Sequence, residues 1–175
     1  WLNQESMFNP TALRNNPEYF LREMNQLARD HGTAHALFVG ALLVAGTPRS
    51  AWLRAATDLD SIVQRVTDLA DPQLLQSGNA QLKVRAILEQ LRFLKPDRVA
   101  PEKGPDNYDL AELLDGYASQ QLGKGRSDCV GLSMIESLVL MRFVVATEYL
   151  LLTHHVKLMI PEVGRVETTA SDLGL

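Results

Sequence analysis

Three residues in the second half of the chain have the side-chain types that thiol catalysis needs: Cys129, His155 and Glu167. Cys129 follows a loop that contains Gly123 and Gly125, and the apolar residues after it predict a helix that begins essentially at the cysteine. A helix N-terminus carries partial positive charge and unpaired N–H groups. These favour the thiolate, which is the reactive form of cysteine, and they offer hydrogen-bond donors to an oxyanion.

A thiolate nucleophile needs a base, and the base needs a third group that orients it. The segment 155–160 places apolar residues at alternate positions, and the segment 165–169 is rich in β-branched residues, so both predict strands. Residues 161–164 between them have the composition of a turn. In the resulting antiparallel pair Glu167 can stand beside His155, hold the imidazole in the required tautomer and stabilise its charged form.

Two of these assignments have an alternative. A lone cysteine is commonly a small buried hydrophobe, so a core thiol remains the second interpretation of Cys129. His154 competes with His155 for the role of base, because neighbouring residues of a strand face opposite sides of the sheet. His155 shares its face with Lys157, and strand alternation alone leaves open which face carries the site.

The histidines do not form a recognisable zinc pattern. Zinc sites use three or four ligands at characteristic spacings, and none is visible around His154 and His155, even with Cys129 or Glu167 added. His31 and His35 lie four residues apart on predicted helix, but without the glutamate of the H-E-x-x-H motif. We therefore expect structural histidines, no metal site and no cofactor.

Upstream of the cysteine the pattern is helical. Asn16-Pro17 and Asp71-Pro72 each place a capping residue before a proline at the first helical position. Gly32 is a plausible helix stop, and Pro105-Asp106-Asn107 predicts the cap of the last helix before the cysteine loop. The spacing of apolar residues predicts helices over about 17–31, 33–45, 48–66 and 82–94, a helix from about 105 to 122, and the cysteine helix.

After Met141 the pattern changes, because residues 143–152 contain several β-branched and aromatic residues and predict a first strand. Helices followed by about three antiparallel strands indicate an α+β fold. We expect a helical region over residues 1–95 and a core over residues 96–175 that holds the cysteine and the sheet. The proline-rich stretch 95–105 connects them, unless both belong to one compact domain.

The composition excludes several function classes. Hydrophobic residues make up 46% of the 175 residues and charged residues 22%, which is typical of a globular protein. The net charge is −4, and the 17 basic residues are scattered, so we expect no nucleic-acid binding. No apolar run is long enough to span a membrane. The single cysteine cannot form an internal disulfide, which favours the cytoplasm. Because the chain begins at Trp1, we expect a fragment or a processed product.

Several local patterns, in order, resemble the bacterial transglutaminase-like family. They are the helix start Asp106–Leu110 with the following leucine pair, the cysteine segment Asp128–Ser133, the histidine strand His155–Ile160 and the acidic segment Val166–Thr169. The resemblance extends over about residues 55–170. It implies a helical region followed by a papain-like thiol fold.

The resemblance also implies a function. It makes Cys129, His155 and Glu167 a catalytic triad for acyl transfer, with hydrolysis by a peptidase or amidase ahead of cross-linking, and with a protein or peptide as substrate. By similarity to papain-like enzymes, Gln120 or Gln121 is a candidate for the oxyanion hole, the alternative being a solvated helix end. The rival hypothesis is an inactive transglutaminase-like scaffold whose helical half mediates protein–protein interaction.

Overall fold

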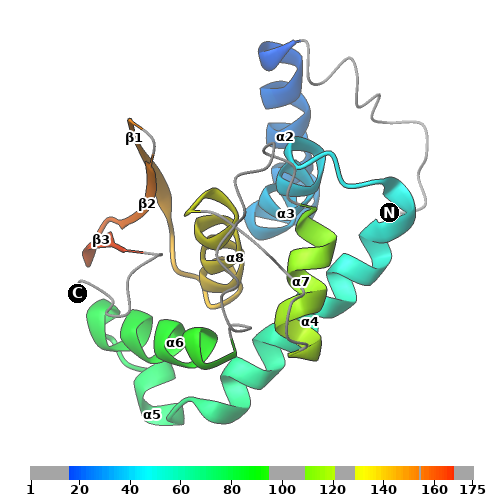
Figure 1. Cartoon of the computed structure of the whole chain (residues 1–175). Helices are drawn as coiled ribbons and strands as arrows, with labels where there is room; N and C mark the ends of the chain where they lie inside the picture. Colours follow the sequence, from blue (N-terminus) through cyan, green and yellow to red (C-terminus); the bar gives the residue numbers. More distant parts are fainter. Residues whose placement is uncertain (1–15, 95–108, 121–128, 154, 168–175) are drawn as a thin grey trace.

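The α+β class predicted from the sequence is confirmed. The computed structural model describes residues 16–94, 109–120, 129–153 and 155–167. Within these ranges the chain forms seven α-helices, one short 3-10 helix and one three-stranded antiparallel sheet (Figure 1). The helices are α2 (Pro17–His31), α3 (Thr33–Val44), η1 (Arg49–Ala51), α4 (Trp52–Leu69), α5 (Pro72–Leu75), α6 (Ala80–Leu94), α7 (Leu110–Ser119) and α8 (Cys129–Arg142).

Side-chain caps fix where several helices begin. The side chain of Asn16 accepts a hydrogen bond from the backbone N–H of Tyr19 at the start of α2, with Pro17 at the first helical position. Asp71 caps α5 in the same way. Asp109 caps α7, so the N-cap of this helix lies after the predicted segment Pro105-Asp106-Asn107, which falls outside the described residues.

The helices share one apolar core with the sheet. The buried face of α4 is formed by Trp52, Ala55, Leu59, Ile62 and Val66, the helical spacing on which its prediction was based. α8 is buried from residue 131 to residue 140 and contacts α3, α4, α6, α7 and the sheet, so it is the central element of the fold (Figure 1). None of the described helices combines the length and the apolar character needed to cross a bilayer.

The sheet has the strand order β1-β2-β3, with β1 (Glu148–Leu152), β2 (His155–Ile160) and β3 (Gly164–Val166). Leu158, Ile160 and Val166 are at most 2% exposed and pack into the core, so one face of the sheet lies against the helices. Gly164 has a φ of 104°, a conformation that favours glycine, at the turn into β3.

Two strand boundaries differ from the prediction. The first strand begins at Glu148 and not at residue 143, because α8 continues to Arg142. The chain then closes the helix end with backbone hydrogen bonds from Phe143, Val144 and Val145 to the last helical turn. The third strand covers Gly164–Val166, so Glu167 directly follows it, and the remainder of the predicted strand lies outside the described residues.

Candidate active site

Cys129 is the first residue of the central helix α8 and is partly exposed. One turn further along the helix, the hydroxyl of Ser133 donates to the carbonyl oxygen of Val156 on β2, at 3.5 Å. After another turn, Ser137 hydrogen-bonds Thr147, which precedes β1. Because β1 and β2 are antiparallel, this order of contacts means that α8 runs in the same direction as β2. The thiol therefore lies at the end of the sheet where β2 begins.

His155 is the first residue of β2, and its side chain contacts Glu167. The imidazole Nε2 lies 2.9 Å from Oε1 of the carboxylate. Leu158 pairs with Val166, which puts Glu167 opposite Lys157 and diagonally across from His155. The ammonium of Lys157 lies 2.6 Å from the other carboxylate oxygen, Oε2. Each oxygen of Glu167 thus has its own cationic or potentially cationic partner.

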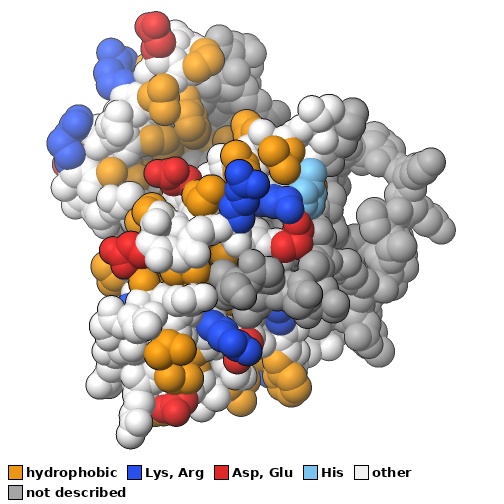
Figure 2. All heavy atoms as spheres, turned by 90° about the vertical axis from the view of Figure 1, so that its left-hand side faces the viewer, with side chains coloured by type: hydrophobic (Ala, Val, Ile, Leu, Met, Phe, Trp, Pro, Cys, Tyr) orange, Lys and Arg blue, Asp and Glu red, His pale blue; other side chains and the backbone are white. Residues whose placement is uncertain are grey.

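Strand alternation determines which face of the sheet carries this cluster. Leu158 is fully buried in the core beneath the sheet, so His155 and Lys157 project from the opposite face. Figure 2 views this side of the molecule and shows a histidine next to Lys or Arg and Asp or Glu side chains. The side chains of the cluster remain 21–29% exposed. The hydrogen bonds of the cluster pair Glu167 with His155 and Lys157, and they do not include Cys129.

Two residues of this cluster were not assigned a role from the sequence. Lys157 was detectable, since it lies two residues after His155 and hence on the same face of the strand. Arg92, near the end of α6, donates a hydrogen bond to the backbone carbonyl of Glu167. No sequence signal points to Arg92, because this contact joins segments that are far apart in the chain.

The two glutamine candidates for an oxyanion hole have different outcomes. Gln120 ends α7 in a left-handed conformation with a φ of 53°, and its side-chain oxygen accepts a hydrogen bond from Arg65 at 2.6 Å. The side chain of Gln120 is thus hydrogen-bonded to Arg65 of α4. Gln121 lies outside the described residues, as does His154, the competitor of His155 for the role of base.

His31 and His35 face each other across the junction of α2 and α3, with ring centroids 5.4 Å apart. Burial, and to a smaller extent the neighbouring charge of His31, lower the pKa of His35 to about 4. His35 is therefore neutral near pH 7. In the parts of the chain that the structure describes, no group of three or more His, Cys, Asp or Glu residues is arranged to hold a metal ion.

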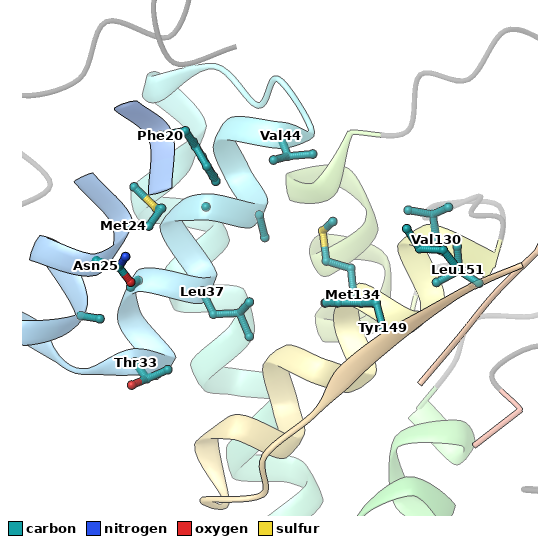
Figure 3. A pocket seen from close by; sticks show the side chains of 15 residues that line it. Phe20, Met24, Asn25, Thr33, Leu37, Val44, Val130, Met134, Tyr149 and Leu151 are labelled. Carbon is teal, nitrogen blue, oxygen red and sulfur yellow. The ribbon is translucent and has the colours of Figure 1, made fainter. Parts of the chain in front are cut away.

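An apolar groove of about 600 Å³ lies beside the start of α8 (Figure 3). Its one wall comes from α2 and α3 and includes Phe20, Met24 and Leu37; the other comes from α8 and the sheet and includes Met134 and Tyr149. The lining also contains Val130 and Val156, the residues that directly follow Cys129 and His155. The groove therefore lies beside Cys129, on the face of the sheet opposite His155.

No protein-family model, curated protein or solved structure matches the chain. The resemblance to transglutaminase-like proteins thus remains a prediction from local sequence patterns. The functional assignment rests on the residues and on their geometry.

Proposed function

We propose that the protein is a thiol-dependent acyl-transfer enzyme of transglutaminase-like type, acting as a peptidase or amidase on a protein or peptide. The observation that carries the proposal is the His155–Glu167 hydrogen bond, made on a strand that runs alongside the helix that begins at Cys129. The single cysteine of the chain is compatible with a reducing compartment, so we place the enzyme in the cytoplasm.

In this mechanism the Cys129 thiolate attacks the amide carbonyl, and a carbon–sulfur bond forms. The amine departs with a proton from the imidazolium of His155, which leaves a thioester on Cys129. Water then attacks the thioester while His155 accepts its proton. The carbon–sulfur bond breaks, the carboxylic acid is released, and the thiolate and the imidazolium are restored. Backbone N–H groups in the first turn of α8 hold the oxyanion, and Glu167 orients and stabilises the imidazolium.

Three features support these roles. Cys129 is partly exposed, so a substrate can reach it, while the helix behind it is buried and hence rigidly held. Glu167 is anchored at both ends, its carboxylate by His155 and Lys157 and its backbone by Arg92. His155 has its Nε2 2.9 Å from Oε1 of Glu167, where the carboxylate can orient the imidazole and stabilise its charged form.

The test is the capture of an acyl-enzyme from p-nitrophenyl acetate, an activated ester, followed by intact mass spectrometry. We expect one acetyl group on the wild type and none on Cys129→Ser. His155→Ala should slow acylation by at least about tenfold, whereas His31→Ala, a histidine outside the site, should leave it unchanged. His154→Ala resolves the choice of base, and a larger loss with this variant would move the role to His154. Equal, slow acylation in all variants would reject the catalytic proposal.

The second candidate function is partner binding by the helical half without catalysis. The groove favours it, because α2 and α3 supply most of the apolar side chains that line it. The two functions differ in their need for the thiol. Cellular function that survives Cys129→Ser but is lost when the groove is altered would support the binding function alone.

A further inference from the structure

We propose that the groove between α2–α3 and α8–β1 binds an extended apolar polypeptide segment, which adds as a strand to the free edge of β1. That this segment belongs to the substrate rests on the proposed function above. The peptide binding itself does not need the thiol and can be tested without it.

The lining of the groove selects an uncharged, apolar occupant. Among the residues that the structure describes, none of the side chains that line it is charged, and the polar exceptions are Asn25, Thr33 and the hydroxyl of Tyr149. Partial burial raises the pKa of the Tyr149 phenol, while its hydrogen bond with Ser137 acts in the opposite direction. The phenol is thus neutral at physiological pH. A phosphate, a carboxylate or an ammonium group would lose its hydration here without gaining a partner.

The rim of the groove keeps large apolar side chains in contact with water. Leu151 on β1 is 76% exposed, Val44 at the end of α3 is 64% exposed, and Tyr149 is 39% exposed. These residues come from both walls and line one groove. Their exposure is unfavourable in the isolated chain, and a ligand that covers them would recover the free energy of burial.

The free edge of β1 decides between an extended peptide and other apolar ligands. In the described part of the chain β1 pairs only with β2, so the backbone N–H and C=O groups on its other side have no sheet partner. The strand Glu148–Leu152 contains no proline, lysine or arginine, the residues that commonly protect an edge from pairing. An alkyl chain or a helix cannot satisfy this edge, whereas an added strand can.

The side-chain pattern matches the same ligand. Tyr149 and Leu151 lie two residues apart on β1, and both line the groove together with Met134 and Val130 of α8 (Figure 3). A peptide paired with β1 projects every second side chain to this face of the sheet, at the same spacing. We therefore expect a segment with apolar residues at alternate positions. Such a segment passes Val130 and so runs next to Cys129 at the start of α8, on the face of the sheet opposite His155.

The test uses a fluorescein-labelled octapeptide that alternates leucine and threonine, with binding measured by fluorescence anisotropy to the full chain carrying Cys129→Ser. We expect saturable binding, weakened about tenfold by Leu151→Thr. The matched control is Leu152→Thr on the same strand: Leu152 is 47% exposed and does not line the groove. Val44→Thr, on the opposite wall, should weaken binding in the same direction as Leu151→Thr. Threonine keeps the strand propensity, and circular dichroism verifies the fold of each variant.

A second peptide isolates the edge pairing. N-methylation of alternate backbone amides removes their donors without changing the side chains, and it should abolish binding. Equal affinity of the methylated peptide, an equal effect of Leu151→Thr and Leu152→Thr, or binding of dodecanoate with no binding of the octapeptide would each overturn the inference. The acylation experiment tests the catalytic proposal separately, so peptide binding without acylation, or the reverse, shows which of the two fails.

Discussion

The imidazole of His155, the first residue of β2, and the carboxylate of Glu167, the residue that follows β3, are in hydrogen-bonding contact at 2.9 Å. The contact follows from the strand register. Leu158 lies opposite Val166, so Glu167 lies opposite Lys157, on the same face of the sheet as His155. Lys157 binds the second carboxylate oxygen from the same face. An acid shared in this way is fixed in position, which is what an orienting residue requires.

Replacement of Glu167 by glutamine tests the orienting role. The substitution keeps the shape of the side chain and removes its charge, so an imidazolium at His155 loses its stabilising partner. We expect the acylation of Cys129 by p-nitrophenyl acetate to slow by roughly tenfold to a hundredfold. The measurement is the acylation rate at pH 7, with Glu162→Gln as the matched control because Glu162 is an exposed glutamate in the preceding turn.

The Glu167→Gln variant must also be shown to be folded, since Arg92 and Lys157 both contact Glu167. Arg92 binds the backbone carbonyl of Glu167, which the substitution retains. We therefore expect the midpoint of urea-induced unfolding to change little. A rate that is the same in Glu167→Gln and Glu162→Gln would mean that Glu167 has no part in the chemistry.

Leu158 is the buried residue that most directly joins the sheet to the core. It is 0% exposed and belongs to the apolar cluster that α8 also enters. We expect Leu158→Ala to lower the free energy of unfolding by about 2–5 kcal/mol, because it removes buried methyl groups and leaves a cavity. Urea unfolding provides the measurement, and Leu151→Ala on the neighbouring strand, 76% exposed, should cost less than about 1 kcal/mol. Similar losses in both variants would contradict the packing described above.

His35 predicts a pH dependence of stability. Its pKa is about 4 in the folded chain and 6.5 as the ordinary value, so between these pH values the unfolded chain binds more protons. Stability is therefore lost as the pH falls from 6.5 towards 4. Because the ring is partly exposed, solvent screening reduces the effect, and we expect about 1 kcal/mol.

The measurement compares urea midpoints at pH 7 and pH 4.5 in the wild type and in His35→Gln, which removes the titrating ring. Other groups titrate equally in both proteins, so the wild type should lose more stability than the variant. If both lose the same amount, His35 does not carry this pH dependence.

The sequence predicted the elements of the fold better than the relation between them. Proline and capping residues identified the starts of α2 and α5, and alternation identified β2, because these signals are local. The predicted strand over 143–152 was wrong in its first half, since α8 continues to Arg142 and is followed by a turn at Phe143–Val144. The strand preference of the β-branched residues there is small, and the packing of the central helix α8 outweighs it.

The candidate site shows the same limit. The pairing of two strands through a short turn allowed the contact of His155 and Glu167 to be expected from the sequence. The contact of Arg92 with Glu167 and the groove walls supplied by α2 and α3 depend on tertiary packing, to which no local pattern points. The face of β2 on which His155 lies could be decided only once Leu158 was known to be buried.

The role of Cys129 as a nucleophile activated by His155 is tested by the rate of iodoacetamide labelling at Cys129, measured at pH 6.5 and pH 9 in the wild type and in His155→Ala. An ordinary cysteine, with a pKa of about 8.5, is only about 1% thiolate at pH 6.5 and labels slowly there. We expect a wild-type rate at pH 6.5 that is within about tenfold of the rate at pH 9, because a charged imidazole and the N-terminus of α8 both favour the thiolate.

In His155→Ala the rate at pH 6.5 should fall by about tenfold or more, while the rate at pH 9 and the labelling of a His31→Ala control stay unchanged. That result would establish a thiolate that depends on His155. Slow labelling of the wild type at pH 6.5, with no change in His155→Ala, would reject the pairing of Cys129 with His155 and leave Cys129 as a structural thiol.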